Sequence, residues 1–398
     1  MHATKIVERM LGGCLTSLHA TLAQAVIAAV NSAALGSRLS LSRLAAGMTP
    51  SRSMRQRIKR MDRLLGNTSL HQKRITIYHS LASQWLTGIT PLLVVVDWSD
   101  ATVDQRWHLL RASVAVEGRS VTLFEEIHPQ QKYGDRNVHR RFLSRLAQLL
   151  PAGSTPIIMT DAGFRSTWFD LVNQRHWQWI GRIRGKDMIC VAEGPWRRCT
   201  DFYREATQVP RAYPDVRYVR ANPTPCRLVL TQRAPKGRTR RTRLGQRARS
   251  RTSLKASRNA REPWLLATSH GLDHLSADAI IALYWHRMRI EQSFRDLKNE
   301  RTGLGLSASR SRSGQRLEIL LLIGHLATWV MRLIGECAQQ CQMHLHFQST
   351  CRLNRKEISV LTLARRVIDA GSTWIGRLHP KEALTLLRDQ AWQACHGF

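Results

Sequence analysis

The sequence predicts a mixed α/β protein, in which a mixed sheet with helices on both faces carries a β-rich insertion and is flanked by helical regions. Apolar runs such as Pro91–Val96 and Pro156–Met159 have the length and continuity of strands that are buried on both faces. Segments with helical periodicity alternate with these runs, which is the pattern of layered α/β domains. A third observation, a long basic stretch without acidic residues, indicates an insertion in that core.

The composition favours a polyanionic partner. The chain has 398 residues, enough for two or three domains, and 43% of them are hydrophobic. Its formal net charge is +33, which opposes compaction unless a polyanion neutralises it. Nucleic acid is therefore the expected partner, and an anionic membrane surface is the alternative.

Neither a membrane span nor a cysteine framework is expected. The most apolar run, Leu317–Ile334, contains Glu318, His325 and Arg332, so we predict a buried core helix. The N-terminal apolar stretch is too polar for a signal peptide. The eight cysteines lack metal-ligand spacing and predict reduced thiols in a cytosolic protein rather than zinc sites or disulfides.

Residues 1–75 are predicted to form a helical DNA-binding region. A short helix over Leu41–Met48 ends at Thr49–Ser51, and a basic helix over Ser53–Leu65 follows it. Two short helices of which the second is cationic fit a helix-turn-helix or a similar unit. A helical bundle without a DNA-binding role is the alternative. The candidate DNA-binding cations of the second helix are Arg55, Arg57, Lys59 and Arg60.

The order of the next elements matches the first part of an RNase H-like core, predicted over residues 76–186. The order is strand, hairpin, helix, strand, helix, strand. Glu117-Gly118 is a plausible turn for the hairpin. The predicted strands are 91–96, 109–116, 120–127, 156–159 and 179–183, and the predicted helices are 137–150 and 167–175.

Residues 187–262 are predicted to be a basic, β-rich insertion. Short strand-like pieces at 216–219 and 226–231 lie among prolines, and Arg233–Arg261 contains no acidic residue. A block of like charge is usually a solvated arm, and such an arm can order on a phosphate backbone. Its candidate DNA-binding residues are Arg238, Arg240, Arg241 and Arg243.

After the insertion, Trp264–Thr268 is expected to resume the sheet in a second core part, residues 263–312. Residues 313–398 form a helical C-terminal region, with helices predicted over 317–337, 358–368 and 381–391. These helices are expected to pack on the core or on a second subunit.

Three carboxylates are candidate metal ligands. Asp97 and Asp161 each follow a buried apolar strand, so we expect both at strand ends, where α/β proteins place their sites. Glu291 lies on a later predicted helix and supplies the third. Carboxylate oxygens suit Mg²⁺. The alternative for either aspartate alone is a turn residue, which is the interpretation of Asp100 and Asp104.

Tyr284, Arg287, Glu291 and Lys298 lie on one stripe of a single predicted helix, because a helix turns about 100° per residue. A carboxylate flanked by two cations and a phenol can hold a metal while the cations bind phosphates. An ordinary solvated helix face is the alternative.

The spacing Tyr-x2-Arg-x3-Glu-x6-Lys resembles the signature of bacterial cut-and-paste insertion-sequence transposases of the DDE class. Asp161-Ala-Gly-Phe164 is similar to that family's second-aspartate motif, and Val-Val-Asp97-Trp to its first. The resemblance implies two Mg²⁺ ions, or Mn²⁺ in their place, held by Asp97, Asp161 and Glu291. It also implies phosphate contacts by Arg287 and Lys298 and a bond from Tyr284.

The same resemblance implies a reaction and partners. The substrates would be terminal inverted repeats and target double-stranded DNA, handled by a homodimer of a cytoplasmic, nucleoid-associated protein. Water nicks the transposon end, the freed 3′-OH forms a hairpin on the opposite strand, a second water opens it, and the 3′-OH joins target DNA. Trp264 matches an aromatic residue that stabilises a flipped base, although a packed Trp at a strand head is the alternative.

Two other functions compete with this one. A non-mobile RNase H-like nuclease or resolvase would need neither the N-terminal region nor the insertion. A defective copy that only binds DNA would tolerate the loss of the acids, yet all three are present.

Overall fold

The computed structural model describes residues 2–49, 52–232, 246, 249–251, 254, 261–350, 357–371, 374, 376 and 378–397. The chain forms two compact units. The first comprises Met1–Ser154 with Met288–Gly397, and the second comprises Thr155–Arg287. Arg238, Arg240, Arg241 and Arg243, the candidate cations of the basic arm, lie outside the described residues.

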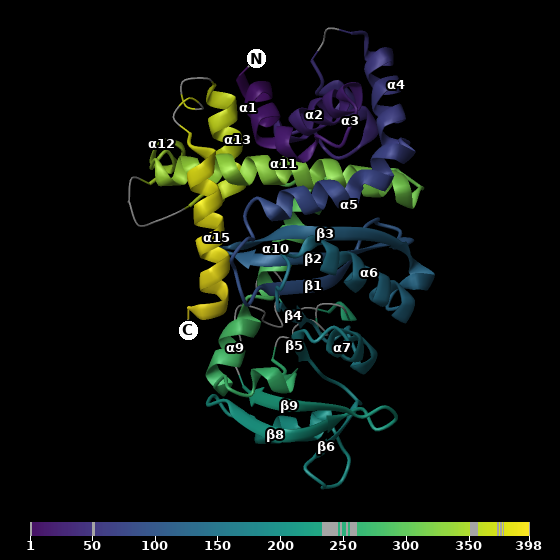
Figure 1. Ribbon diagram of the computed structural model, residues 1–398, viewed down its shortest axis with the longest axis vertical. Coiled ribbons are helices and arrows are strands. Elements are labelled where there is room, and N and C mark those ends of the chain that lie inside the picture. Colours follow the sequence, from purple (N-terminus) through teal and green to yellow (C-terminus); the bar gives the residue numbers. More distant parts are fainter. Residues whose placement is uncertain are drawn as a thin grey trace. The chain divides into compact units, whose positions relative to one another are not determined.

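The N-terminal part of the first unit is helical, as predicted (Figure 1). Ser53 caps the basic helix, because its hydroxyl accepts from the Gln56 amide while the Gln56 side chain accepts from the Ser53 amide. The predicted short helix and basic helix are thus confirmed as α3 and α4. The helices of this part are α1 (His2–Leu11), α2 (Ala20–Ala34), α3 (Leu41–Ala46), α4 (Met54–Leu65) and α5 (Thr68–Ser83).

The strands of the first unit form an antiparallel sheet in the order β3-β2-β1. They are β1 (Leu93–Asp100), β2 (Trp107–Val116) and β3 (Arg119–Pro129). Gly118 closes the predicted hairpin with φ 69°, a left-handed conformation that glycine adopts without steric cost.

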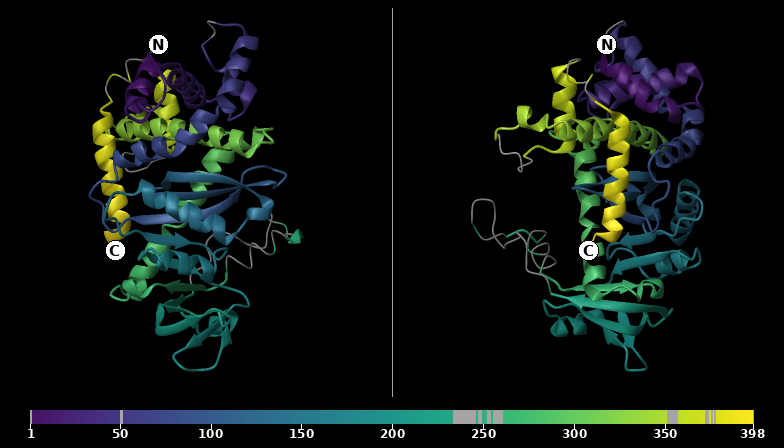
Figure 2. Two further views of the ribbon diagram at one scale, coloured as in Figure 1. Left: turned by 45° about the vertical axis from the view of Figure 1, so that its right-hand side comes forward. Right: turned by 60° about the vertical axis from the view of Figure 1, so that its left-hand side comes forward.

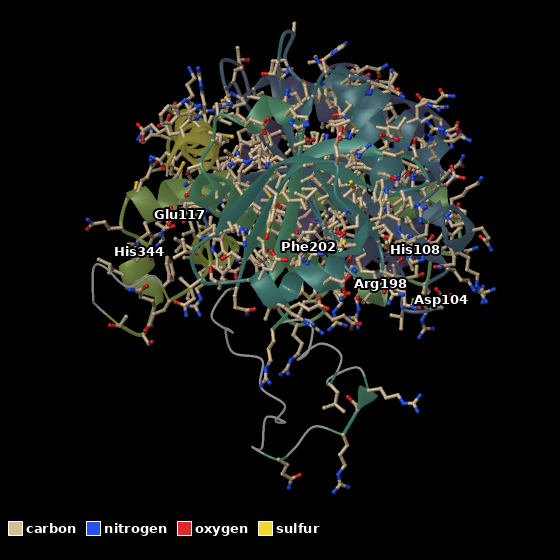
Figure 3. The ribbon with its side chains drawn as sticks, turned by 90° about the horizontal axis from the view of Figure 1, so that it is seen from below. Asp104, His108, Glu117, Arg198, Phe202 and His344 are labelled. Carbon is tan, nitrogen blue, oxygen red and sulfur yellow. The ribbon has the colours of Figure 1, made fainter. Side chains whose placement is uncertain are left out.

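The expectation that Asp97 ends its strand is wrong. β1 continues to Asp100, and Asp97 is paired in register with Arg111 of β2. The polar sequence Asp97–Asp100 resembles a turn, but β2 is long enough to pair with all of it. The turn that follows contains Asp104, which bonds to Thr102, and leads to His108 in β2 (Figure 3). The turn interpretation is confirmed for Asp104, whereas Asp100 is the last residue of β1.

Helices cover this sheet (Figure 2). The long helix α11 (Gly314–Gln340) packs against β3 and α2, and α13 (Val360–Ala370) and α15 (Pro380–His396) pack against α11. Other helices in the described part of the unit are η1 (Gly12–Cys14), η2 (Gln130–Lys132), α6 (Arg136–Leu149), α10 (Met288–Lys298), η5 (Leu306–Ala308) and α12 (His344–Phe347).

Helix α11 is the predicted core helix. Among the described residues it is the one helix long and apolar enough to cross a membrane, and 94% of its most apolar window is buried inside the protein. Glu318 of this helix forms an ion pair with Arg74 at 2.9 Å, and Arg332 forms one with Glu336. Pairing of this kind allows charged groups to be buried in a protein core.

The second unit is a mixed sheet in the order β4-β5-β10-β9-β8-β6-β7. β4 and β5 are parallel, and the other neighbours are antiparallel. The strands are β4 (Ile157–Thr160), β5 (Gln178–Arg182), β6 (Met188–Val191), β7 (Arg197–Arg198), β8 (Arg211–Tyr218), β9 (Thr224–Thr231) and β10 (Trp264–Thr268). The helices whose bounds lie within the described residues are α7 (Ser166–Asn173), η3 (Cys199–Glu205), η4 (His270–Leu272) and α9 (Ala277–Trp285). Residues 187–262 were predicted to be β-rich, and their described part contains the strands β6, β7, β8 and β9.

Candidate active site and nucleic-acid interface

Asp97 lies in the middle of β1 and is 7% exposed. One of its carboxylate oxygens accepts from the Trp98 amide at 2.9 Å. The Trp98 indole N–H donates to Nε2 of His139 on α6 at 3.2 Å, which fixes this part of the strand against the helix. A carboxylate so nearly buried costs desolvation free energy unless cations or hydrogen-bond donors face it.

Lys298, at the end of α10, faces the same strand. Its ammonium donates to the Ser99 hydroxyl at 2.6 Å, two residues beyond Asp97. Burial lowers the pKa of Lys298, and the neighbouring carboxylates of Asp100 and Asp97 oppose that shift. Asp97 and Lys298 are therefore close enough to interact electrostatically within the first unit.

Glu291 lies in the first turn of α10 and is exposed. A carboxylate at this position is favoured by the helix dipole. The helix packs against β1, β2 and β3, so Glu291 and Asp97 lie on two elements that contact each other within the first unit.

The prediction of one continuous helix from Tyr284 to Lys298 is wrong. α9 ends at Trp285 and α10 begins at Met288. The amides of His286 and Arg287 bond to the carbonyls of Leu283 and Tyr284, three residues back, so the chain tightens into a turn there. The four residues of the signature therefore do not share one helix.

Asp161 follows β4 in the second unit, at a strand end as predicted. Its carboxylate accepts from the Gly163 amide at 2.8 Å, and the guanidinium of Arg287 lies 4.0 Å from its other oxygen. Phe164, the last residue of the motif, is buried and packs on Trp168 with ring centroids 4.7 Å apart. The motif is thus a short turn that leaves the aspartate carboxylate 37% exposed next to a cation.

Tyr284 and Trp264 are in contact in the second unit. Their rings meet edge to face, with centroids 5.1 Å apart, and Trp285 lies 5.8 Å from Trp264. Tyr284 is 3% exposed. Trp264 therefore has packing partners at the head of β10.

The carboxylates fit a hard divalent ion by their chemistry, since Mg²⁺ takes oxygen ligands. Within either unit, the described residues contain no group of three or more His, Cys, Asp or Glu side chains arranged to hold a metal. Asp97 and Glu291 belong to one unit and Asp161 to the other. The described interactions join Asp97 with Lys298 and Asp161 with Arg287.

Residues 89–329, more than half of the chain, match the family model described as the transposase DDE domain. The chain belongs to this family. The match spans β1, the Asp161 turn and α10, and the mixed α/β fold is consistent with the RNase H-like core of a DDE transposase. No curated protein matches the chain. Membership implies a transposase or nuclease that acts on DNA with divalent metal ions.

The cations predicted on α4 differ in their surroundings in this transposase. Arg55 and Lys59 are exposed, and Arg60 is half-buried. Arg57 instead donates to backbone carbonyls of Ala46 at 2.9 Å and Met48 at 3.0 Å, so it ties the end of α3 to α4.

A second cationic surface of the transposase was not predicted from the sequence. A groove of about 780 Å³ in the first unit, which we call the arginine–serine groove, contains no acidic side chain in its lining. In the described part of the chain, Arg43, Arg310 and Arg312 have no carboxylate partner, whereas Arg38 pairs with Glu300 and Arg316 with Asp62. The alternation of Ser and Arg over residues 307–313 is the sequence signal that could have found it. Its lining residues are Arg38, Ser40, Leu41, Ser42, Arg43, Leu65, Ala308, Ser309, Arg310, Ser311, Arg312, Ser313, Arg316 and Leu320.

Proposed function

We propose that this DDE-domain transposase excises an insertion sequence at its terminal inverted repeats and joins it to target DNA, using Mg²⁺. The observation that carries the proposal is the nearly buried Asp97 carboxylate, which lies on the strand that Lys298 contacts through Ser99. A carboxylate and an ammonium side by side suit a metal and a phosphate that are bound together.

Asp97, Asp161 and Glu291 would hold two Mg²⁺ ions, for which Mn²⁺ could substitute. Ions bound there would activate the attacking oxygen and stabilise the leaving one during displacement at phosphorus. Lys298 and Arg287 would bind the phosphates beside the scissile bond, and Tyr284 would bond to one of them. These side chains thus orient the DNA strand, and no covalent protein nucleophile is needed.

The order of steps follows from the resemblance to the transposase of the tetracycline-resistance composite transposon. Water nicks the transposon end, and the free 3′-OH attacks the opposite strand to form a hairpin. A second water opens the hairpin, and the 3′-OH then joins the target. Two subunits would act together in the synaptic complex, with C-terminal helices pairing them, and Trp264 would stabilise a base flipped out during hairpin formation.

Several cationic surfaces would bind the duplex. Residues 1–75 would form a DNA-binding domain that contacts phosphates through α4. The arginine–serine groove, which is lined by side chains from this domain and from residues 308–320, would contact further phosphates. The arm residues Arg238, Arg240, Arg241 and Arg243 would bind further phosphates from the insertion, residues 187–262. The core would comprise residues 76–186 and 263–312, with 313–398 as a C-terminal helical region. A protein that binds DNA in this way would reside in the cytoplasm on the nucleoid.

The decisive assay incubates the purified protein with Mg²⁺ and linear DNA that ends in the gene's own flanks. Hairpin-ended products are expected from the wild-type chain. The Asp97→Ala variant should bind these ends with nearly unchanged affinity, because binding depends on cationic side chains, but should not cleave them. Persistent cleavage by Asp97→Ala would refute the role of this carboxylate.

The two competing functions give other products. Cleavage without hairpins would indicate a nuclease or resolvase. Binding without any cleavage by the wild-type chain would indicate a defective copy.

A further inference from the structure

The back face of α10 carries three polar side chains in one stripe. Taking Arg289 as zero and about 100° per residue, Ser293 lies near 40° and Asp296 near 340°. We call Arg289, Ser293 and Asp296 the back-face residues. All three contact a continuous segment of five residues at the β2–β3 hairpin, Val116–Ser120.

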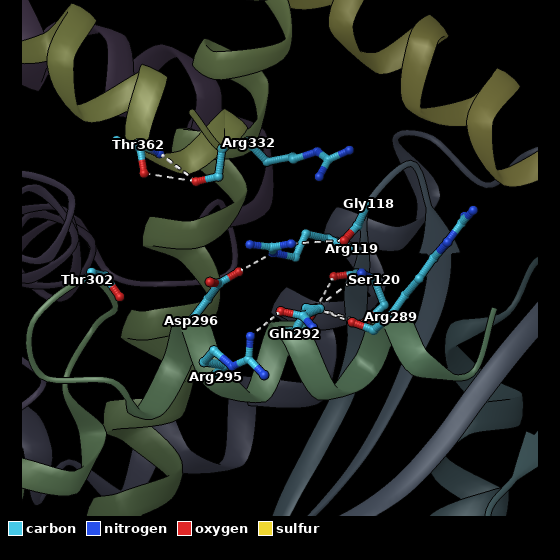
Figure 4. Close-up of polar contacts among 12 residues, drawn as sticks. Gly118, Arg119, Ser120, Arg289, Gln292, Arg295, Asp296, Thr302, Arg332 and Thr362 are labelled. Atoms are coloured by element: carbon cyan, nitrogen blue, oxygen red, sulfur yellow. Dashed lines mark hydrogen bonds and ion pairs between the residues drawn. The ribbon is translucent and has the colours of Figure 1, made fainter. Parts of the chain in front are cut away.

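Each back-face residue makes a specific bond to that segment. Arg289 donates to the Val116 carbonyl at 2.6 Å. The Ser293 hydroxyl accepts from the Ser120 amide at 3.1 Å and donates to the Ser120 carbonyl at 2.9 Å. Asp296 accepts from Arg119 at 2.6 Å, an ion pair that Figure 4 shows between the helix and the hairpin.

Glu291 and Lys298 occupy the opposite side of the same helix. On the scale used above they lie near 200° and 180°. A helix of this length moves as one body, so bonds that fix its back face also fix the direction of its front face. Rotation of α10 or a shift along its axis would move Glu291 and Lys298 together relative to β1.

Packing on this side of the helix is incomplete. A cavity of about 40 Å³ lies behind α10, lined by Ser293, Asp296, Arg119 and Ser120 together with Trp329 and Arg332 of α11. A space of this size is large enough for a water molecule. The cavity leaves part of this face without packing contacts, so the polar bonds of the back-face residues add to the apolar packing of Ile290, Phe294 and Leu297 in holding the helix in place.

We propose that Arg289, Ser293 and Asp296 are positioning residues of the transposase, which set where Glu291 stands relative to Asp97. The proposal rests on the proposed function, in which both carboxylates hold metal. It assigns to the β2–β3 hairpin, and to the pair Arg119–Asp296 in particular, a role in metal binding without touching metal or DNA. Removal of residues that orient metal ligands typically lowers metal affinity or activity roughly 10- to 100-fold.

The test compares the variants Ser293→Ala and Asp296→Asn with the wild-type protein and three controls. Gln292→Ala removes a bond to Arg295 that stays within α10 and joins it to no other element (Figure 4). Ser32→Ala removes a buried hydroxyl that donates to the Leu44 carbonyl, and so lowers stability without touching α10. Glu291→Gln removes the proposed ligand itself. Thermal unfolding, affinity for end DNA, the Mn²⁺ dependence of cleavage, and Mn²⁺ binding to the free protein by electron paramagnetic resonance are measured for each.

The expected result is a rise of roughly tenfold or more in the Mn²⁺ concentration needed for half-maximal cleavage by Ser293→Ala and Asp296→Asn. DNA affinity should stay within about twofold of wild type, and weaker Mn²⁺ binding should parallel the cleavage defect. Ser293→Thr, which keeps the hydroxyl, should restore the wild-type Mn²⁺ dependence.

The controls separate the possible failures. If Ser32→Ala, at equal loss of thermal stability, shifts the Mn²⁺ dependence as much as Ser293→Ala does, the proposed positioning role is overturned. The positioning role is also overturned if Ser293→Ala and Asp296→Asn show the same Mn²⁺ dependence of cleavage as Gln292→Ala while Glu291→Gln is inactive. A wild-type protein without metal-dependent cleavage, or an active Glu291→Gln variant, would instead overturn the proposed function.

Discussion

Single residues around Asp97 show how one strand combines folding and chemistry. The Asp97 carboxylate interacts electrostatically with Lys298, while the next residue, Trp98, donates its indole N–H to His139. Nε2 of His139 accepts that bond and must be unprotonated for it. Burial lowers the pKa of His139 to about 4, with Asp135 opposing the shift.

This histidine makes stability depend on pH. Its pKa in the folded chain lies below the unfolded value, so between about pH 6.5 and 4 the unfolded state binds the proton and stability falls as the pH falls. At about 1.4 kcal/mol per pKa unit, the loss by pH 5 is about 2 kcal/mol. The variant His139→Gln retains an acceptor for the Trp98 indole but does not take up this proton. Between pH 7 and 5, its free energy of unfolding should fall by about 2 kcal/mol less than that of the wild type, as measured by urea unfolding followed by circular dichroism.

His79→Gln is the matched control, because His79 is exposed on α5. It should follow the wild-type dependence. If the free energy of unfolding of His139→Gln depended on pH in the same way as that of the wild type, His139 would not be the cause of this pH dependence.

Trp264 has two candidate roles that kinetics can separate. If its ring stabilises a flipped base, Trp264→Ala should slow hairpin formation more than first-strand nicking, and Trp264→Phe should retain part of the rate. Trp196→Ala, which removes a half-buried tryptophan between β6 and β7, is the control. Equal slowing of both steps would show that Trp264 is a packing residue for Tyr284 and Trp285.

At the scale of elements, apolar runs and helical periodicity predicted most of the strands and helices. Two features could not be predicted from these patterns. The turn at His286–Arg287 keeps the polar and apolar spacing of a helix, so periodicity continues across a break made by backbone bonds three residues apart. The extension of β1 to Asp100 depends on its partner strand and not on its own residues.

The candidate site shows the same limit. Motif spacing identified Asp97, Asp161 and Glu291, but the bond between Ser120 and Ser293 joins residues 173 positions apart and has no local signal. The strand β7 was not predicted because two residues are too few for a periodicity to be seen.

The arginine–serine groove yields a prediction about DNA affinity. The double variant Arg310→Ala/Arg312→Ala should bind end DNA more weakly at every sequence. For each DNA phosphate that the variant no longer binds, the slope of log affinity against log salt concentration should become shallower by about 0.9. Fluorescence anisotropy over a range of salt concentrations measures both the affinity and the slope.

A matched pair of arginines on another surface provides the control. Arg140→Ala/Arg141→Ala removes the same charge from the exposed side of α6 and should leave the slope unchanged. An equal effect from both pairs would show that the groove does not bind DNA specifically.

At the scale of the whole molecule, the chain has a net charge of +33 and is divided into two compact units. The proposed ligands of one site are divided between these units, with Asp161 in the second and Asp97 and Glu291 in the first. DNA that binds both units would neutralise their charge.

The most direct test of this account is anomalous diffraction from Mn²⁺ in a crystal of the protein bound to its own end DNA. We expect two Mn²⁺ peaks about 4 Å apart beside the scissile phosphate. Carboxylate oxygens of Asp97, Asp161 and Glu291 should lie within about 2.5 Å of at least one peak. A carboxylate from any of the three that lies more than about 10 Å from both peaks, well beyond the spacing of paired ions, would contradict it.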